Sequence, residues 1–579
     1  MRANSSIRLD SYSRKFRYLS GIIVLASGAI LISYLVQPDT GYVKAPPASD
    51  LRSFAVVRLA GADKAAGSEQ PVPQVTDARI PAFPGAQGDG AASRGGRGGK
   101  TLIVDRLDDP CPTKACTTED LASAALATPG TLRWALLQNF PRTIVFRVSG
   151  IIRLQEDLVE LIDGQQHVKR LGIIRIRNPY LTVAGQTAPA GGITIAGNGV
   201  SIETHDVVLR YLRFRTGRGK QAFFKDQQNP ETLMIGNGAR EVMVDHCSFS
   251  WMPAEGVSVY TGESYDGSTG TAGNITLSWN IIGEGLIQHK DGRGHPNGAF
   301  MSGFDGAEHY AARNITLHHN LFVHTQKRNG DLLSYNGRLV NNLFYNWQWL
   351  PTVIAGGVEA DIIGNIWKPG PMTGIKEGDT QGVHLVPAAS ELEGADAQDW
   401  WRAVSGAPSL FLSGNAFGSA QQVLLNQQDV LCYYRSRNES CREEIPDSRW
   451  FRQAAMTPAE HAVLHDAVNT AEQRVLQQAG ASQRVNLSGK WVANRDAVDE
   501  RYVSEYRDTT YLLERFPWHE QQVGGYPQQI EGAPYPDRDR DGMSDLWEVQ
   551  NGLNPADAND AQLPAKNGGG YTNLEVFIH

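Results

Sequence analysis

Short runs of hydrophobic and β-branched residues recur along the middle of the chain, each followed by an asparagine and two apolar positions. The run 277–282 (LSWNII) returns as 317–322 (LHHNLF), 339–344 (LVNNLF) and 362–367 (IIGNIW). The last three copies are a little over twenty residues apart, about one turn of a solenoid. Because one such turn cannot bury its apolar face alone, we expect the turns to stack as parallel strands.

The repeated asparagine is expected to occupy one corner of each turn. Asparagine tolerates a left-handed backbone, and its side chain can bond to the asparagine of the turns above and below. The segment 244–249 (VDHCSF) fits the same frame, with Cys247 in the asparagine position. Such a ladder is structural. A β-propeller or a β-sandwich would favour strands paired through hairpin turns. The repeated pattern of an asparagine followed by two apolar residues is not a hairpin pattern.

Beyond residue 390 the spacing of apolar residues changes to three and four, which indicates helices. We expect helices at 400–404 and 458–478. The second carries a start signal, with Thr457 as N-cap, Pro458 at the first helical position and Glu460 three residues after the cap. The predicted fold class is therefore all-β, a parallel solenoid followed by a partly helical C-terminal tail.

The N-terminus is basic over residues 1–20 and apolar over 21–36. This pattern predicts an export signal, or an uncleaved membrane anchor, although the run is short for a span of about 20 residues. A secreted or periplasmic protein is expected on the first interpretation, and one anchored by its N-terminal helix on the second. The further expected segments are a linker at 37–78, the solenoid at 79–390, a partly helical extension at 391–530 and a final segment at 531–579.

The composition and net charge of the chain indicate which classes of binding partner are expected. A chain of 579 residues with 41% hydrophobic residues can bury a sizeable core, and its 60 glycines suit many short strands joined by turns. The formal net charge of -8 argues against nucleic acid as a partner. It does not exclude a local basic groove for an acidic sugar polymer.

The five cysteines fall into two close pairs and one single residue. Cys111 with Cys116, and Cys432 with Cys441, are expected to form two local disulfides, which suits an oxidising compartment. Zinc is the alternative, but neither pair has further Cys or His ligands at finger spacing. Cys247 lies within an apolar strand and is expected to be a free, buried thiol.

A series of motifs between residues 79 and 370 resembles the bacterial pectate lyase family, whose members fold as right-handed parallel β-helices. The motifs occur in the family's order, which is more specific than any single match. They are 82–86 (AFPGA), 95–99 (GGRGG), 129–133 (PGTLR), 144–150 (IVFRVSG), 180–189 (YLTVAGQTAP), 210–215 (RYLRFR) and 244–251 (VDHCSFSW).

The resemblance implies a lyase that cleaves pectate or a related uronate polymer by β-elimination. The C5 proton of a uronate is barely acidic, so a bound Ca²⁺ is implied to neutralise the adjacent carboxylate. Arg328 stands where the family has its catalytic arginine. Lys290 and Lys327 are implied to bind the acidic polysaccharide, and a monomer is expected.

The groove departs from the family pattern after the arginine. Gly330 and Asp331 occupy the stretch where family members carry a proline and a further arginine. An aspartate beside the base would keep a guanidinium protonated. Two further hypotheses therefore stay open: a degenerate, lyase-like protein that only binds acidic glycans, and a glycoside hydrolase of the same fold, which would need paired carboxylates.

The implied groove calcium has few ligands. Glu231 and Glu255 match acidic positions of the family, but Ala254 replaces a third acid. Calcium takes about six to eight oxygens, so water and substrate would have to complete this cage.

A more specific metal motif lies near the end of the chain, in 537–548 (DRDRDGMSDLWE). Acids occupy its first, third, fifth, ninth and twelfth positions and glycine the sixth, which is the spacing of an EF-hand-type calcium loop. We expect a structural Ca²⁺ here that clamps the tail. The expected ligands are Asp537, Asp539, Asp541, the backbone carbonyl of Met543, Asp545 and Glu548.

Overall fold

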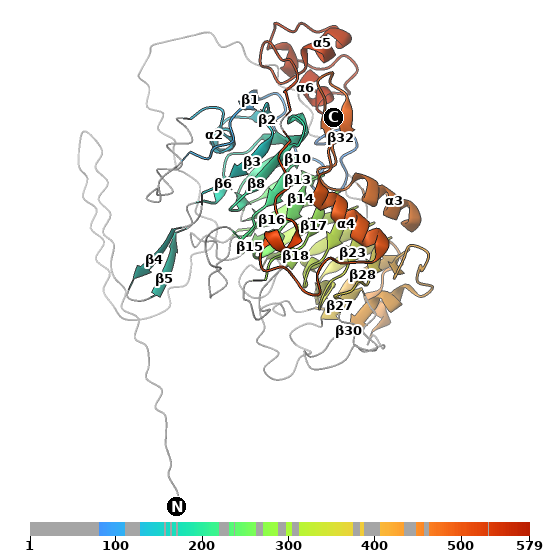
Figure 1. The fold of residues 1–579 in the computed structure, drawn as a ribbon. Helices are drawn as coiled ribbons and strands as arrows, with labels where there is room; N and C mark the ends of the chain where they lie inside the picture. Colours follow the sequence, from blue (N-terminus) through green and yellow to red (C-terminus); the bar gives the residue numbers. More distant parts are fainter. Residues whose placement is uncertain are drawn as a thin grey trace, which may run out of the picture. The chain divides into compact units, whose positions relative to one another are not determined.

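In the computed structural model, strands from successive turns of the chain stack in parallel into three long sheets (Figure 1). Each turn contributes one short strand to each sheet, and side chains from all three sheets meet in one hydrophobic core. The parallel β-helix expected from the repeated pattern is thereby confirmed. The hairpin pairs of a propeller or sandwich do not occur in these three sheets.

The structure describes most of the chain from residue 80 onward. The predicted segments at 21–36, 37–78 and 400–404 lie outside the described residues. Among the helices that are described, none has both the length and the apolar character needed to cross a bilayer. The described ranges are 80–110, 128–155, 158–162, 165–169, 172–218, 231–236, 238–261, 270–287, 297–303, 312–373, 382–386, 406–433, 447–456, 462–530 and 532–579.

Neighbouring strands in each sheet come from successive turns. Sheet 1 is ordered β1 (Lys100–Val104), β2 (Arg142–Phe146), β7 (Leu181–Ala184), β10 (His205–Arg210), β13 (Arg240–Asp245), β16 (Ala272–Ser278), β19 (Ala312–His318), β22 (Asn336–Val340), β25 (Glu359–Ile363) and β28 (Ser409–Ser413). Sheet 2 is ordered β3 (Gly150–Arg153), β8 (Ile193–Ala196), β11 (Arg213–Arg215), β14 (Ser248–Ser250), β17 (Ile281–Gly283), β20 (Leu321–Val323), β23 (Leu343–Tyr345), β26 (Ile366–Lys368) and β29 (Ala416–Phe417).

Sheet 3 completes each turn; Glu255 starts one of its strands, and Glu231 and Arg328 lie just before two others. Its strands are ordered β6 (Ile174–Ile176), β9 (Val200–Ile202), β12 (Leu233–Ile235), β15 (Glu255–Thr261), β18 (Asn297–Gly303), β21 (Asn329–Leu333), β24 (Thr352–Ala355), β27 (Val383–Val386) and β30 (Leu431–Tyr433). Two antiparallel hairpins lie outside the sheets, β4 (Leu158–Ile162) with β5 (Gln165–Lys169), and β31 (Gln483–Val485) with β32 (Trp491–Ala493).

The solenoid extends further than expected. The strands β28, β29 and β30 lie beyond residue 390 and pair in parallel with β25, β26 and β27. The predicted boundary at 390 is therefore wrong, because one more turn follows before the tail begins. At the other end, helix α2 (Leu132–Leu137) packs against β1 and β6 and contributes Leu132 and Leu136 to the core.

A ladder of buried asparagines runs along the corner between sheets 1 and 2, as predicted. The side chain of Asn342 accepts hydrogen bonds from the backbone and side-chain nitrogens of Asn320, at 3.0 and 2.9 Å. Its own amide donates to the carbonyl of Leu317 at 2.8 Å and to the side chain of Asn365 at 3.0 Å. The same bonds repeat through Asn280 and Asn415. Each rung thus satisfies backbone groups that the corner leaves unpaired.

Cys247 occupies one rung of this ladder. It is free and buried, as predicted. Its backbone nitrogen donates to the side chain of Asn280 at 2.8 Å, and its thiol donates to the carbonyl of Asp245 at 3.5 Å. Burial raises the pKa of this thiol to about 12. It is therefore an inert part of the corner.

The sequence suggested that the repeated asparagine takes the left-handed backbone conformation at each corner. In the structure, the residue with that conformation is not the asparagine. It is the residue just before, as at His246, Trp279 and His319, with φ of 52°, 55° and 55°. In this conformation the preceding side chains point along the stack. Their rings lie face to face, with centroids 5.8 Å apart for His246 and Trp279 and 4.3 Å for Trp279 and His319. Aromatic stacking thus favours the same register as the asparagine bonds.

Two helices of the tail cover the outer face of sheet 2 (Figure 1). They are α3 (Val468–Gln478) and α4 (Ala497–Asp508). Apolar residues of both helices share one buried cluster with outward-facing residues of sheet 2, among them Val475, Tyr502 and Leu321. The buried guanidinium of Arg215 bonds to Asp499 at 3.1 Å and also pairs with Asp496, the N-cap of α4. The helical part of the tail therefore packs on the solenoid.

Helix α3 starts later than the sequence suggests. The predicted cap, Thr457 with Pro458 and Glu460, lies outside the described residues, and helix α3 begins only at Val468. The residues just before it are held extended by bonds to the solenoid, because the backbone of Asp466 donates to Asn341 at 2.8 Å. Tertiary contacts thus override the helical spacing there.

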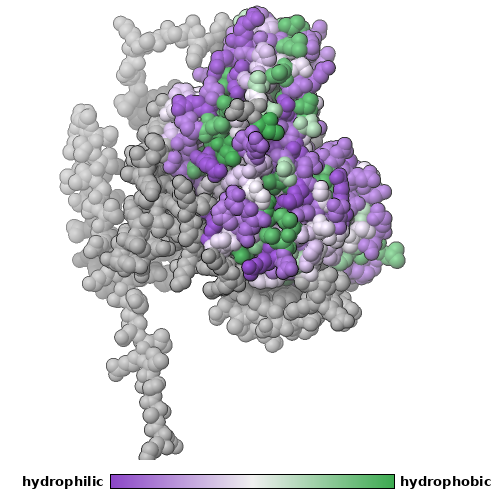
Figure 2. All heavy atoms as spheres, viewed as in Figure 1, coloured by the Kyte–Doolittle hydropathy of each residue, from purple (hydrophilic) through white to green (hydrophobic). Residues whose placement is uncertain are grey.

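The surface of the described residues is largely hydrophilic. On the face shown in Figure 2, hydrophobic side chains form small, separate patches between polar ones. Some of the exposed hydrophobic residues belong to the tail, among them Leu546 and Val549. Single exposed hydrophobic residues are common on protein surfaces.

We predict that the asparagine ladder is worth several kcal/mol. Asn342→Ala would leave the backbone N–H of Asn320 and the carbonyl of Leu317 buried without these partners, at a cost of about 1–3 kcal/mol each. Urea unfolding should show this as a lower midpoint. Asn469→Ala, at an exposed position of α3, should leave the midpoint close to that of the wild type. An equal midpoint for both variants would contradict the structural role of the ladder.

Candidate functional site

Arg328 lies immediately before β21, on the turn that leads into sheet 3. Parallel pairing aligns it with earlier turns, since Glu255 at the start of β15 pairs with Asn297 at the start of β18, and Asn329 pairs with Ala299. Residues far apart in sequence are thus brought to one edge of sheet 3 by the register alone. Arg328 itself has a left-handed backbone, with φ of 60°.

The guanidinium of Arg328 forms an ion pair with Glu255. The same Glu255 oxygen accepts a hydrogen bond from the side chain of Asn297 at 3.0 Å. Arg328 also stacks over the ring of Phe300, with its guanidinium carbon 4.3 Å from the ring centroid. Its side chain keeps 18% of its surface exposed, against 9% for Glu255. Among the described residues, the Glu255 carboxylate and the Phe300 ring hold this partly accessible cation in place.

Burial and pairing act in opposite directions on Glu255. Burial by itself raises the pKa of this carboxyl, but the charge of Arg328 and the hydrogen bonds from Asn297 and Arg328 outweigh it. The net pKa lies below the usual value, so Glu255 is an anion at neutral pH. It acts as the counterion of Arg328.

A β-bulge follows Arg328. The pairing of β18 with β21 shifts register between Ala299 and Phe300, so that Phe300 pairs with Asp331 and Gly330 is left over. Gly330 has φ of 72°, where a side chain would be strained. This explains how glycine can stand where the family pattern has proline. Bulges of this kind often redirect side chains next to active sites.

From its position in the sequence, Asp331 was expected to lie beside Arg328 and keep the guanidinium protonated. In the structure, Asp331 and Arg328 do not form a direct ion pair. It is buried, and its carboxylate accepts the backbone N–H of Val353 at 2.9 Å. Burial raises the pKa of Asp331 to about 7, although the bond from Val353 and the charge of Arg328 both act to lower it. Asp331 is therefore partly protonated near neutral pH.

The predicted groove calcium does not find a ready cage among the described residues. Glu255 is engaged by Arg328 and Asn297, and Glu231 accepts a hydrogen bond from Ser258. Within the described part of the chain, no group of three metal-binding side chains includes either glutamate. The described residues therefore offer no three-ligand group around either glutamate, and the groove calcium stays a prediction.

The two predicted substrate-binding lysines can be followed only in part. Lys290 lies outside the described residues. Lys327 is half-buried beside Arg328, and its carbonyl accepts the backbone N–H of Gly298 at 3.2 Å. Its substrate-binding role stays a prediction.

The predicted disulfides can likewise be followed at one residue. Cys432 takes part in a disulfide. Its expected partner Cys441, and both Cys111 and Cys116, lie outside the described residues. The pairing scheme stays a prediction.

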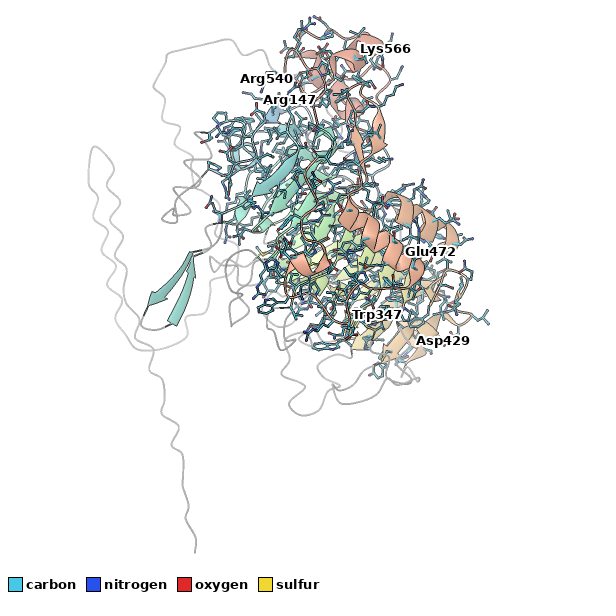
Figure 3. All side chains as sticks on the ribbon, viewed as in Figure 1. Arg147, Trp347, Asp429, Glu472, Arg540 and Lys566 are labelled. Carbon is cyan, nitrogen blue, oxygen red and sulfur yellow. The ribbon has the colours of Figure 1, made fainter. Side chains whose placement is uncertain are left out.

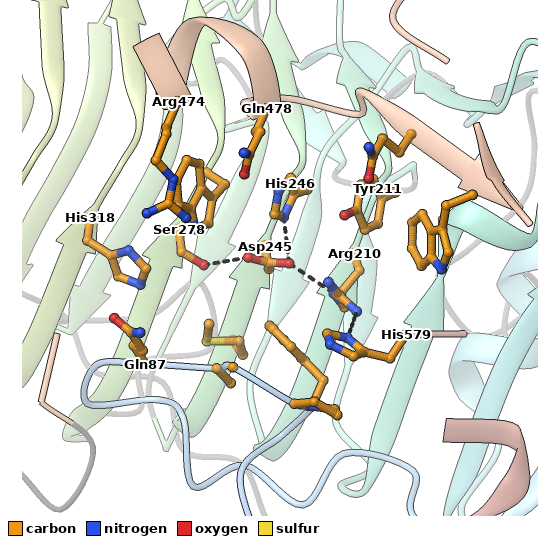
Figure 4. Close-up of a pocket in the computed structure, with 18 residues that line it drawn as sticks. Gln87, Arg210, Tyr211, Asp245, His246, Ser278, His318, Arg474, Gln478 and His579 are labelled. Carbon is orange, nitrogen blue, oxygen red and sulfur yellow. Dashed lines mark hydrogen bonds and ion pairs between the residues drawn. The ribbon is translucent and has the colours of Figure 1, made fainter. Parts of the chain in front are cut away.

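A pocket of about 390 Å³ lies on the outer face of sheet 1, where the segment 83–87 and the tail approach the strands (Figure 4). Asp245 is at its centre and receives bonds from Arg210 at 2.9 Å, His246 at 2.8 Å and Ser278 at 2.7 Å. Burial raises the pKa of Asp245, but the charges of His246 and Arg210 bring it well below its usual range. These bonds join three neighbouring turns, so Asp245 has a structural role in holding them together.

The calcium loop of the tail brings together most, but not all, of its predicted ligands. Asp537, Asp539 and Asp541 form one group of neighbouring carboxylates. Glu548 joins a second group, with Asp541 and Asp560. Burial, and then the charge of neighbouring acids, raise the pKa of Asp541 to about 7 and that of Glu548 to about 8.

Asp545 and Asp560 differ from the sequence prediction. Asp545 starts helix α5 (Asp545–Asn551) and accepts the backbone N–H of Arg538 at 2.8 Å, outside both groups of carboxylates. Asp560 was missed because it follows the loop by twelve residues, and no local spacing marks it. The backbone N–H of Met543 donates to Asp541 at 2.8 Å, while the predicted role of its carbonyl stays untested.

Comparison with known proteins gives relatives over most of the chain. No protein-family model matches. The chain is 27% identical over 505 residues to a probable pectate lyase C of Emericella nidulans, covering 86% of this chain and 92% of the relative. It is 31% identical over 299 residues to a probable pectate lyase C of Neosartorya fischeri, covering 51% and 56%.

The solved structure described next has a lower sequence identity to this chain than the sequence relatives have. The major allergen from cedar pollen has a TM-score of 0.42 and 15% identity, covering 68% of this chain and 92% of the allergen. The sequence relatives described above are fungal, so the resemblance to pectate lyases is supported, whereas its restriction to bacterial members is not.

We predict that Asp331 lowers stability as pH rises. Its folded-state pKa of about 7 lies above the unfolded value, so its favourable contribution is complete below about pH 4 and is lost as pH rises through 7. Each unit of that difference is worth about 1.4 kcal/mol. Asp331→Asn should therefore melt higher than wild type at pH 8.5 and similarly at pH 4.5.

The control is Asp508→Asn, at an exposed position near the end of α4. Its melting temperature should follow the wild-type pH profile. If Asp331→Asn also followed that profile, the buried carboxyl would not be the group that titrates.

Proposed function

We propose that this protein is a polysaccharide lyase that cleaves pectate or a related uronate polymer by β-elimination, with Arg328 as the base. The observation that carries the proposal is the position of Arg328. It is the residue that matches the catalytic arginine, and it lies partly exposed at one edge of sheet 3, between Glu255 and Phe300. The relatives named probable pectate lyase C, similar over 86% of this chain, support the same activity.

The proposed reaction needs one proton acceptor and no attacking water. Arg328 takes the proton from C5 of the uronate, and the electron pair of that bond forms a double bond between C4 and C5. The bond from C4 to the glycosidic oxygen breaks, and the leaving oxygen gains a proton from solvent. The products are a shortened chain and an unsaturated uronide.

The ion pair with Glu255 sets the condition for this chemistry. An anion beside a guanidinium favours the charged form, which cannot accept a proton. Arg328 must therefore leave Glu255, or Glu255 must be neutralised, when substrate binds. The carboxylate of a uronate is a natural competitor for the guanidinium, because both anions bind it in the same geometry.

A bound calcium ion could assist the same β-elimination reaction. A divalent ion bound to the uronate carboxylate would neutralise charge beside C5. Glu231 and Glu255 are already engaged by protein groups, so no step of the proposal passes through a groove metal.

A second candidate is a protein that binds acidic glycans without cleaving them. The specific observation in its favour is again the Arg328–Glu255 pair, which holds the arginine in its protonated form. Export from the cell, by secretion or to the periplasm, would suit either function.

We predict that Arg328→Ala abolishes lyase turnover while the protein stays folded. The variant removes the proton acceptor, while the buried Glu255 keeps its hydrogen bond from Asn297. The measurement is growth of ultraviolet absorbance from unsaturated uronide on polygalacturonate, with and without chelator. The expected loss is about a hundredfold or more, the contribution typical of a positioned base.

The matched control is Arg449→Ala, because Arg449 is an exposed arginine paired with Asp447. It should retain full activity. Unchanged turnover in Arg328→Ala would remove this residue from the mechanism. New reducing ends without absorbance in the wild type would identify a hydrolase, and retardation in a polymer gel without either product would favour the glycan-binding alternative.

A further inference from the structure

Five carboxylates from two segments of the tail converge at one place. Asp537, Asp539 and Asp541 each bring an oxygen within 4.8 Å of the others, and Asp541, Glu548 and Asp560 do the same. Asp541 belongs to both groups, so the two form one continuous cluster. The first four acids come from the predicted calcium loop, and Asp560 comes from a short 3₁₀ helix (Asp560–Gln562) further along the chain.

The oxygens at the centre of this cluster are buried and have no partner among the residues that the structure describes. Both oxygens of Asp539 and of Glu548, one of Asp541 and one of Asp560 make no hydrogen bond within the described structure. Glu548 is fully buried, and Asp541 is 2% exposed. Buried carboxylates without partners are costly, and several together repel one another. This observation is independent of the sequence spacing and indicates a positively charged ligand.

Within the described part of the chain, protein cations do not neutralise the centre of the cluster. Arg147 bonds to Asp537 at 3.1 Å, at the edge of the cluster. Arg540 turns away from the cluster and pairs with Asp105 at 3.0 Å. The oxygens of Asp539, Asp541 and Glu548 named above are left facing one another. Carboxylate oxygens are among the ligands that calcium prefers.

The cluster lies against the first turn of the β-helix (Figure 3). Arg147 follows β2, and Asp105 follows β1. The loop backbone at Gly542 comes so close that an added Cβ would lie 2.9 Å from Thr101 and 3.2 Å from Val145. The amide of Gln562, two residues after Asp560, donates to Thr101 at 3.3 Å. Both segments that supply carboxylates therefore also contact the same edge of the solenoid.

We propose that these five carboxylates bind one calcium ion, and that this ion holds the tail on the first turn of the β-helix. The ligand set is Asp537, Asp539, Asp541, Glu548 and Asp560, with Asp560 in place of Asp545. By joining the loop to the segment around residue 560, the ion closes the tail over the outer face of β1 and β2. The site is separate from Arg328 and does not depend on the proposed lyase activity.

The test is calcium titration of the chelator-treated full chain, followed by calorimetry and thermal unfolding. Wild-type protein should bind one ion tightly and melt at a higher temperature with calcium than with chelator. Glu548→Gln and Asp560→Asn should each weaken binding at least about tenfold and remove most of the calcium-dependent rise in melting temperature. Asp545→Asn is the matched control and should bind calcium as the wild type does.

Hydrogen exchange provides a local readout. With chelator, residues 532–579 and the β1 segment should exchange faster, while the asparagine corner between sheets 1 and 2 should not change. Wild-type protein that binds no calcium, or melts equally with and without chelator, would overturn the site. Full binding by Asp560→Asn combined with loss in Asp545→Asn would overturn the proposed ligand set. Because lyase activity is not measured, its failure would leave this result unaffected.

Discussion

Hydrogen bonding between stacked turns is the constraint on which the rest of this structure depends. Each turn offers the same corner to the next, and the asparagine side chains from Asn280 to Asn415 close the gaps that the corner leaves in the backbone pairing. A slip of one residue would break every rung at once and turn core residues outward. The stack is therefore held to one register, and that register aligns residues such as Glu255 and Arg328 from separate turns.

In the candidate groove, a one-residue bulge at Gly330 affects which carboxylate lies beside Arg328. Gly330 accommodates a bulge, and the bulge turns Asp331 into register with Phe300 instead of leaving it beside Arg328. The counterion of Arg328 then becomes Glu255, two strands away in sheet 3. A carboxylate that would suit a metal is used to hold the arginine. The balance between binding and base catalysis in this groove depends on how readily that pair opens.

The C-terminal tail covers parts of the solenoid that would otherwise be exposed to solvent. Helices α3 and α4 bury the outer face of sheet 2, and buried pairs such as Arg215 with Asp499 fix their position. The loop around Gly542 lies on β1 and β2 at the first turn. An acidic cluster at this contact is unfavourable by itself, and a bound cation would convert the same repulsion into a cross-link between segments.

The sequence by itself determined the solenoid, the asparagine ladder with Cys247 in one rung, and the spacing of the tail loop, because these follow from repeats and motifs a few residues long. It did not reveal the last turn beyond residue 390 or the late start of α3 at Val468. Only the tertiary structure decided that Arg328 pairs with Glu255, and that Asp560 joins the tail cluster. Those contacts join residues far apart in the chain, and their partners depend on register and packing, which no local pattern encodes.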